Sequence, residues 1–352
     1  MPFELVVLFM SFAVSFLLTG PVIMLARKLN LVTNKALRFH PAHTHEGIVP
    51  RAGGVPIFLA IFITVIVFLP INKIMFGILL ASSILVIIGT IDDYSDISPY
   101  VRFALNLIVS AIVIGFGLGI PYLSNPFGQA IPLDAWIINF DFFGTRSIWL
   151  LADILAIVWL TWTTNMVNWS KGVDGQLPGF VAITAIFMGL LGARFTAHDI
   201  SVQSVTLFSF IVAGAYLGFL PFNFFPQKIM PGYGGGGLAG FLLGVLSILS
   251  FGKLGTAVLI LSVPMIDAVY TIVRRIRKRQ SPFRADWGHF HHRLLEIGWG
   301  KRRIAVFYWL ISFILGISSL FLKGVEKIIA FVTCGVILLA FMLIINRMKK
   351  LK

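Results

Sequence analysis

The sequence predicts an all-α polytopic integral membrane protein with about eleven transmembrane helices. Apolar residues make up 58% of the 352-residue chain and charged residues only 12%, and the mean hydropathy is +0.94. A soluble domain has about half apolar and about a quarter charged residues. Apolar stretches also recur along the chain, each close to the roughly 20 residues that cross a bilayer. They cover residues 3–25, 54–71, 74–91, 101–119, 148–165, 176–193, 204–220, 236–251, 253–272, 303–322 and 326–346.

The two ends of the chain fit this interpretation. The first span lacks a cationic segment before it and a cleavage site of small residues after it, so we expect a retained helix and not a signal peptide. The single cysteine, Cys334, falls inside the last span, where it cannot form an intrachain disulfide and is expected to pack against its neighbours.

The basic residues predict the orientation. The loops after the odd-numbered spans, together with the C-terminal tail, hold 22 of the 28 lysines and arginines. This asymmetry places the N-terminus outside and the C-terminus in the cytoplasm. A net charge of +14 would suggest a nucleic-acid partner in a soluble protein. Here most of the net charge reflects the membrane topology, and the remaining positive charge can attract anionic headgroups or phosphates. We therefore expect no nucleic-acid partner.

One membrane-embedded domain is expected over residues 1–352. Two connections in it are long enough to describe separately. Residues 120–147 form an outer loop with alternating apolar residues around Trp136, which predicts a small hairpin. Residues 273–302 form a basic cytoplasmic loop.

A pair of adjacent carboxylates, Asp92 and Asp93, stands directly after an apolar run, with Asp96 close behind. Two like charges repel each other, and burying either near lipid costs several kcal/mol unless a cation meets it. One explanation is a solvated helix end. The other is a site that faces a metal ion or a cationic group, and the other cytoplasmic loops decide between the two by supplying partners.

Two further loops combine polar residues with glycines. Asn168 and Asp174 lie in a glycine-containing turn, and Asn223 precedes the glycine-rich stretch Gly232–Gly237. Glycines let backbone approach a ligand closely, and a glycine-rich loop that opens a helix offers N–H groups to phosphate. Ordinary turns have the same composition, so each loop alone is a weak signal.

Asp267 lies inside a predicted span after Pro264, and an ionisable residue there is functional by default. A basic, histidine-rich stretch follows, with Arg284 and Arg293 on either side of three histidines. These histidines are His289, His291 and His292. Zinc binding is one interpretation, but the sequence offers no second cysteine and the arginines disfavour a cation. Phosphate contacts or proton transfer are favoured.

Carboxylates, basic groups and a glycine loop therefore gather at one membrane face. Mg²⁺ held by one or two carboxylates and by substrate phosphates is the usual way to activate a diphosphate. A nucleotide-diphosphate donor and a lipid acceptor form the reaction class that needs this chemistry at a bilayer surface.

Ordered motifs over residues 38–306 carry a family resemblance. They are Pro50–Gly54 (P-R-x-G-G), Gly89–Pro99 (G-x-x-D-D-x-x-x-x-S), Asn165–Gly175 (N-x-x-N-x-x-D-G-x-D-G), Asn223 in Asn-Phe-x-Pro, Pro264–Asp267 (P-x-x-D) and Pro282–Leu294 (P-F-x-A-D-x-x-H-x-H-H-R-L). In these stretches the chain resembles the polyprenyl-phosphate N-acetylhexosamine-1-phosphate transferases, the family that also contains phospho-MurNAc-pentapeptide translocase.

The resemblance implies transfer of a sugar 1-phosphate, with N-acetylhexosamine as the expected sugar. The donor would be a UDP-sugar and the acceptor undecaprenyl phosphate in the bilayer of the bacterial inner membrane. UMP would leave, and the site would face the cytoplasm and start the synthesis of a cell-envelope polymer. A homodimer is one of the oligomeric states that the resemblance leaves open.

The resemblance also implies roles for individual residues. Mg²⁺, or Mn²⁺ in its place, would be held by Asp267 and Asp93. Asp92 or Asp93 would deprotonate the acceptor phosphate, and a covalent phospho-aspartate route stays open beside direct attack. Nucleotide contacts are expected from Asn168, Lys171, Asp174 and Asn223. Phosphate contacts are expected from Arg51, Arg102, His289, His291 and His292.

Two positions depart from the motifs. Lys171 stands where the first D-G aspartate is expected, and Tyr233 stands where a G-D-S-G-S loop has its aspartate. Exchanging an acid for a base changes the charge by two units, so Lys171 is expected either to contact a phosphate or to pair with Asp92 or Asp174.

Two rival functions remain. Phospho-MurNAc-pentapeptide translocases usually carry three consecutive histidines, which His289-Phe290-His291-His292 lacks. A transporter with an intramembrane acid relay should show inverted repeats and charges at the midplane. The sequence shows no such repeat, and its acids lie at one face.

Overall fold

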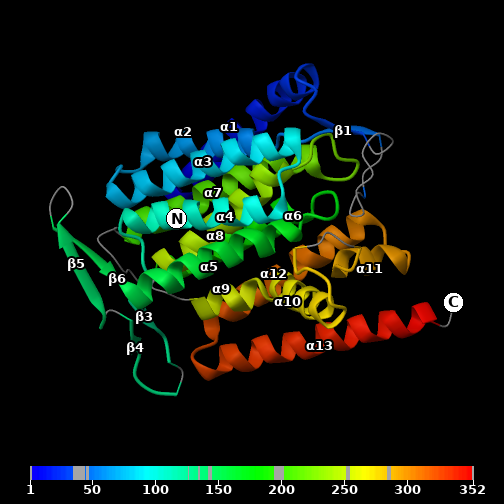
Figure 1. The fold of residues 1–352 in the computed structure, drawn as a ribbon. Helices are drawn as coiled ribbons and strands as arrows, with labels where there is room; N and C mark the ends of the chain where they lie inside the picture. Colours follow the sequence, from blue (N-terminus) through cyan, green and yellow to red (C-terminus); the bar gives the residue numbers. More distant parts are fainter. Residues whose placement is uncertain are drawn as a thin grey trace.

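The computed structural model describes residues 2–34, 44, 47–125, 127–133, 135–141, 145–193, 202–250, 254–283 and 287–350. Over these residues the chain is a bundle of helices with short two-stranded sheets at its ends (Figure 1). The helices are α1 (Pro2–Lys28), α2 (Gly54–Phe68), α3 (Lys73–Ser95), α4 (Pro99–Gly115), α5 (Leu150–Trp169), α6 (Gln176–Gly192), α7 (Val202–Asn223), α8 (Gly232–Leu249), α9 (Leu254–Ile260), α10 (Ser262–Arg277), α11 (Phe290–Glu296), α12 (Lys301–Phe321) and α13 (Val325–Lys350).

Each of the eleven predicted spans contains helix, and the polytopic membrane class is confirmed at that level. Within the described parts of the chain, seven helices are long and apolar enough to cross a membrane, namely α1, α3, α5, α7, α8, α12 and α13. The helices α2, α4 and α6 are apolar but shorter, with 15, 17 and 17 residues.

The predicted span over 253–272 is not one straight helix, because helices α9 and α10 meet at an angle of 83°. Pro264 explains the break. It has no N–H to continue the helical ladder, and its ring clashes with the carbonyl four residues earlier. That residue is Ile260, the last residue of α9. A broken span at this place turns α10 away from the axis of α9 and carries Asp267 with it.

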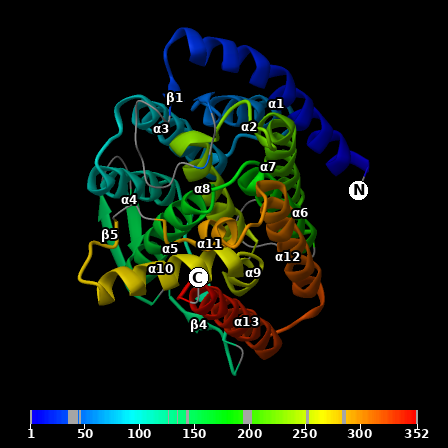
Figure 2. The same cartoon turned by 90° about the vertical axis from the view of Figure 1, so that its right-hand side faces the viewer.

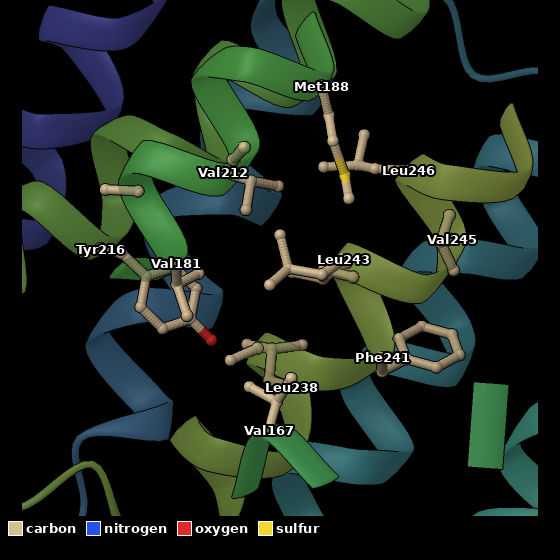
Figure 3. Close-up of a cluster of buried hydrophobic side chains, with 14 of the residues drawn as sticks. Val167, Val181, Met188, Val212, Tyr216, Leu238, Phe241, Leu243, Val245 and Leu246 are labelled. Carbon is tan, nitrogen blue, oxygen red and sulfur yellow. The ribbon is translucent and has the colours of Figure 1, made fainter. Parts of the chain in front are cut away.

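The centre of the bundle is α8, which packs against α3 and α5. Its window of 18 residues is entirely buried, whereas the corresponding windows of α1 and α13 are 28% and 17% buried. Large apolar side chains such as Phe241 and Leu243 fill the space between α8 and its neighbours (Figure 3). The outer helices leave apolar side chains exposed, as expected for helices that face lipid.

Glycines set the close packing of α8. A Cβ on Gly240 would lie 2.2 Å from the carbonyl oxygen of Thr163 in α5, and a Cβ on Gly89 in α3 would lie 2.2 Å from Cα of Gly234. Small residues let helix backbones approach in this way. The last turn of α3, which carries Asp92 and Asp93, is thereby pressed against the start of α8.

The two ends of the bundle differ. One end carries the strand pairs β3 (Tyr122–Leu123) with β4 (Ile131–Pro132), and β5 (Ile137–Asp141) with β6 (Thr145–Trp149). These pairs fall in and directly after the predicted outer loop, 120–147. The pair β1 (Val32–Asn34) with β2 (Ile48–Pro50) lies at the other end, together with α11 (Figures 1 and 2).

The predicted basic loop, 273–302, contains more structure than expected. It comprises the end of α10, the short helix α11 and the residues that lead into α12. Arg284 and Asp286 lie outside the described residues.

Candidate active site

Asp92 is fully buried at the end of α3. Its Oδ2 accepts a hydrogen bond from Nη1 of Arg102 at 3.1 Å, and its Oδ1 accepts one from the backbone N–H of Ile97 at 3.0 Å. Asp96 ends α3 in the left-handed conformation, with φ of 49°. Asp92 therefore fixes the turn between α3 and α4 and orients Arg102 at the same time.

Asp93 is also buried, and it faces two other parts of the chain. Nε of Arg51, the residue after β2, donates to its Oδ1 at 3.1 Å. The backbone N–H of Tyr233, in the first turn of α8, lies 3.0 Å from both carboxylate oxygens. A helix N-terminus favours a negative charge, so the Tyr233 amide and the Arg51 guanidinium offset part of the cost of burying the Asp93 carboxylate.

The turn at Gly232 requires glycine. Its φ is +68°, and a Cβ there would lie 2.0 Å from Oδ2 of Asp93. The predicted glycine-rich phosphate loop thus holds a protein carboxylate in this structure. Within the described residues the amide of Tyr233 points to Asp93.

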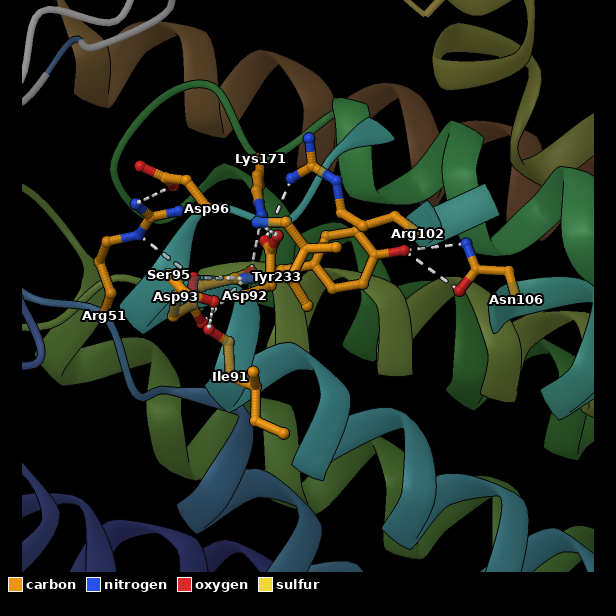
Figure 4. Close-up of polar contacts among 12 residues, drawn as sticks. Arg51, Ile91, Asp92, Asp93, Ser95, Asp96, Arg102, Asn106, Lys171 and Tyr233 are labelled. Atoms are coloured by element: carbon orange, nitrogen blue, oxygen red, sulfur yellow. Dashed lines mark hydrogen bonds and ion pairs between the residues drawn. The ribbon is translucent and has the colours of Figure 1, made fainter. Parts of the chain in front are cut away.

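Lys171 is the third cation of this group, which we call the Asp92–Asp93 cluster. Its ammonium donates to the carbonyl oxygen of Gly232 at 2.7 Å and lies 5.8 Å from the ring centroid of Tyr233. The guanidinium of Arg102 is 5.4 Å from the same ring, and the Tyr233 hydroxyl is hydrogen-bonded to Asn106. Figure 4 shows these side chains converging from α3, α4, α8 and two loops.

The Asp267–His289 cluster is a second buried group. Nδ1 of His289 is 2.9 Å from Oδ2 of Asp267, and the backbone N–H of Phe290 donates to Oδ1 at 2.7 Å. Asp267 therefore caps α11 and orients His289. The His289 ring is 6.2 Å from the ring of Trp169, at the end of α5.

His291 and His292 lie in the first turn of α11, and both are buried. A Cβ on Gly172 would overlap the His291 ring, so this ring lies directly against the loop after α5. Burial lowers the pKa of His291 well below its usual value, and the neighbouring histidines lower it further. His291 is therefore a neutral imidazole near pH 7.

Asp174 and Asn223 have mainly structural contacts. Oδ2 of Asp174 accepts from the backbone N–H of Gln227 at 3.3 Å, and its Oδ1 lies 3.6 Å from Nζ of Lys301. Burial raises the pKa of Asp174, while Lys301 opposes the rise. Asn223 accepts from the Gly175 amide at 3.0 Å and donates to the carbonyl oxygen of Ile229 at 2.9 Å. These bonds tie the loop after α5 to the loop after α7.

The loop Ser170–Gly175 connects all these groups. Lys171 belongs to the Asp92–Asp93 cluster, Gly172 touches His291, and Asp174 joins Asn223 through the Gln227 segment. Asn168, just before this loop, has a buried Oδ1 without a hydrogen-bond partner in the described structure. Every predicted site residue is thus in one of the clusters or beside this loop.

Sequence reasoning missed the site roles of Asn106, Gln227 and Lys301. The departure of Tyr233 from the motif singles out this residue in the sequence, but the sequence does not predict which residues it contacts. Lys301 carries no local signal, because its partner lies far back in the sequence.

A resident Mg²⁺ does not fit this donor set. Each oxygen of Asp92 and Asp93 already accepts a hydrogen bond from an arginine or a backbone amide, and both oxygens of Asp267 are engaged by His289 and Phe290. In the described part of the chain, no group of three or more His, Cys, Asp or Glu side chains is arranged to hold a metal ion. Mg²⁺ needs near-octahedral oxygen ligands, which no such group among the described residues supplies.

The predicted ligands Asp93 and Asp267 also lie in different clusters. No hydrogen bond or ion pair joins them in the described structure. Mg²⁺ or Mn²⁺ therefore stays a prediction from the resemblance, without support from this geometry.

Comparison with known proteins identifies the class. The sequence pattern of glycosyl transferase family 4 matches residues 75–251, which include α3, the loop after α5 and α8. The chain belongs to this family, and the resemblance to polyprenyl-phosphate N-acetylhexosamine-1-phosphate transferases is confirmed.

Individual relatives cover most of the chain. A protein of Bacillus subtilis named probable undecaprenyl-phosphate N-acetylglucosaminyl 1-phosphate transferase is 29% identical over 91% of this chain and 86% of its own length. Decaprenyl-phosphate N-acetylglucosaminephosphotransferase of Mycobacterium tuberculosis is 30% identical over 84% of this chain and 77% of its own. A Thermotoga maritima undecaprenyl-phosphate alpha-N-acetylglucosaminyl 1-phosphate transferase is 28% identical, over 88% of both chains.

Proposed function

We propose that this chain transfers N-acetylglucosamine 1-phosphate from its UDP-linked form to undecaprenyl phosphate, and that UMP leaves. The observation that carries the proposal is the Asp92–Asp93 cluster, in which two buried carboxylates hold Arg51, Arg102 and Lys171 together. Clustered cations in a partly water-excluded site are what a diphosphate and a phosphate need in order to approach each other. The names of the relatives support the sugar and the lipid.

The bond changes are those of a phosphoryl substitution. An oxygen of the acceptor phosphate forms a bond to the phosphorus that carries the sugar. The bond from this phosphorus to the bridging oxygen breaks, and UMP leaves with the electron pair. A phosphate monoester has its second pKa near 6, so Asp92 or Asp93 has to accept a proton only from the monoanionic fraction of the acceptor.

Direct attack is favoured over a phospho-aspartate route. A carboxylate that accepts hydrogen bonds from arginine and backbone amides is stabilised as an anion and is a weaker nucleophile. Both oxygens of Asp92 and of Asp93 are in this state. We assign the two carboxylates to holding the cations and to proton transfer.

The rival functions have less support. His-Phe-His-His and the names of the relatives both favour N-acetylglucosamine over a MurNAc-pentapeptide donor. Membership of a glycosyl transferase family argues against a transporter.

An assay with purified protein tests this function. Undecaprenyl phosphate, Mg²⁺ and a panel of UDP-sugars are supplied, and UMP release is followed together with the lipid product. UDP-N-acetylglucosamine is expected to give the highest kcat/KM. Release of UMP only from UDP-MurNAc-pentapeptide, or from no donor at all, would refute the proposal.

We place the Asp92–Asp93 cluster at the cytoplasmic face of the inner membrane, on the basis of the basic-residue asymmetry. The strand pairs β3–β4 and β5–β6 at the opposite end would then be outside. In a Cys334→Ser background, cysteines at Ser95 and Ser281 should be labelled only from the cytoplasmic side, and one at Gln129 only from outside. Labelling of Ser95 and Ser281 from opposite sides would contradict a shared site.

A further inference from the structure

The charges of the Asp92–Asp93 cluster balance without a metal ion. Among the residues that the structure describes, its three carboxylates are Asp92, Asp93 and Asp96, and its three cations are Arg51, Arg102 and Lys171. The formal charge is therefore zero. With aspartates at positions 171 and 233, as the resembling motifs have them, five carboxylates would face two arginines, and such a site needs a divalent cation to bind a diphosphate.

The ammonium of Lys171 lies where a compensating cation is required. It is held by the carbonyl oxygen of Gly232 at 2.7 Å, and the next residue, Tyr233, donates its N–H to both oxygens of Asp93. The carboxylates of Asp93 and Asp92 attract this ammonium, while the two arginines repel it.

Packing keeps the lysine in this place. A Cβ on Gly236 would lie 3.1 Å from Cδ of Lys171 and 2.3 Å from Oδ1 of Asn168, so the start of α8 closes on the lysine stem. One of the three ammonium N–H groups is used by Gly232, the single hydrogen bond of Lys171 in the described structure. The remaining donors are available to a phosphate oxygen, as in other lysines that bind phosphate as point charges.

The two departures from the motifs are in contact with each other. Lys171 lies over the ring of Tyr233, and an aromatic ring attracts a cation where a second carboxylate would attract a metal. The Tyr233 hydroxyl is fixed by Asn106, so the ring has a defined position under both Lys171 and Arg102. One substitution supplies a cation, and the other removes a candidate metal ligand.

We propose that the ammonium of Lys171 takes the place of a divalent cation in this chain, so that the transfer of the sugar phosphate proceeds without a resident metal ion. In this role Lys171 is a catalytic residue, because its ammonium contacts the donor phosphates. The inference rests on the proposed function and is an alternative to the expectation that Asp93 and Asp267 hold Mg²⁺.

Turnover with and without divalent ions is the first test. UMP release from UDP-N-acetylglucosamine is measured in EDTA and in Mg²⁺, for the wild type and for Lys171→Gln, which keeps a donor for Gly232 but loses the charge. The wild type should keep kcat/KM in EDTA within about threefold of its value in Mg²⁺. Lys171→Gln should lose about 100-fold in EDTA and regain at least about tenfold with Mg²⁺.

Two controls accompany this test. Lys171→Arg keeps the charge and should not become dependent on Mg²⁺. Lys228→Gln removes an exposed lysine after α7 and should behave as the wild type. A wild-type enzyme that is inactive in EDTA and active in Mg²⁺ would overturn the inference and leave the proposed function intact. No UMP release in either buffer would instead refute the proposed function.

Metal binding gives a readout that is independent of activity. Mn²⁺ is titrated into the wild type and into Lys171→Asp without substrate, and bound ion is followed by electron paramagnetic resonance. The wild type should bind no stoichiometric Mn²⁺, whereas Lys171→Asp should gain a site that Asp93→Asn removes from the double variant. Stoichiometric Mn²⁺ on the wild type, displaced by Mg²⁺, would overturn the inference whether or not turnover is seen.

Discussion

The Asp92–Asp93 cluster and the Asp267–His289 cluster share one structural feature but have different roles. In both, a buried aspartate accepts a backbone N–H from the first turn of a later helix. Asp93 accepts from Tyr233 in α8, and Asp267 accepts from Phe290 in α11. The side-chain partners differ. Asp93 is met by arginine and lies near the ammonium of a lysine, whereas Asp267 is met by a histidine.

Because of this difference, the Asp92–Asp93 cluster is suited to bind phosphate, whereas the Asp267–His289 cluster positions a helix. Arg51, Arg102 and Lys171 come from three different segments and give an anion several charged donors at once. Asp267 and His289 instead fix α11, and α11 in turn presses His291 against Gly172. A buried aspartate at a helix N-terminus therefore does not by itself define a reaction centre. The cations around it do.

The largest effect is expected from Asp93→Asn. The amide cannot balance Arg51 and Lys171 and cannot accept a proton, so kcat/KM for UMP release should fall about 10³-fold. Ser95→Ala, in the exposed last turn of α3, is the matched control and should stay within about threefold of the wild type. If Asp93→Asn keeps near wild-type activity, the reaction takes place elsewhere.

A smaller effect is expected from Asp267→Asn. A hydrogen bond to a charged group contributes about 1.5–3 kcal/mol, so losing the charge should loosen α11 and lower kcat/KM by about tenfold through misplacement of His289 and His291. Hydrogen exchange of residues 287–296 should become faster in this variant and stay unchanged in Asp93→Asn. An activity loss equal to that of Asp93→Asn, with unchanged exchange, would assign Asp267 to the reacting groups.

The smallest effect on kcat/KM is expected from changing the pH, through the charge of Lys171. Burial lowers the pKa of Lys171 to about 8, with Asp93 acting against the decrease. The ammonium is present below this pH and is lost above it, so kcat/KM should fall up to tenfold per pH unit above about 8. The groups that face this ammonium from neighbouring elements are Asp92, Asp93, Arg51, Arg102 and Tyr233.

Lys171→Arg should remove this alkaline limb, because arginine stays protonated. The free energy of unfolding should rise with pH, whereas kcat/KM should fall. The unfolded chain binds more protons than the folded one between about 8 and 10.5, so the wild type should become more stable relative to Lys171→Arg as the pH rises through this window. An alkaline limb that persists in Lys171→Arg would show that another group titrates.

Much of the fold could be predicted, because it depends on composition and local pattern. Apolar stretches of about 20 residues indicate helices wherever they occur. The bend at Pro264 was missed, since this residue was interpreted only as part of a motif. Helix α11 was missed because seven residues show no clear periodicity, and its cap, Asp267, lies 23 positions earlier.

The site could be predicted as a set of residues but not as a geometry. Asp92, Asp93 and Lys171 stand out in the sequence by their charge. The pairing of Arg51 with Asp93 spans 42 positions. It depends on the backbone hydrogen bond from Met230, just before α8, to Pro50 of β2, and on the packing of α3 against α8. The assignment of Asp267 to the same metal as Asp93 came from motifs alone, which carry no distances.

The fate of the two donor phosphates tests the central claim, transfer of the sugar-bearing phosphate at the Asp92–Asp93 cluster. UDP-N-acetylglucosamine with ³²P in the sugar-linked position and ³³P in the uridine-linked position is incubated with undecaprenyl phosphate and either the wild type or Asp93→Asn. The account predicts that the wild type places ³²P in the lipid and ³³P in UMP, and that Asp93→Asn forms almost no labelled lipid. Lipid that carries both labels, or equal lipid labelling by the two proteins, would contradict it.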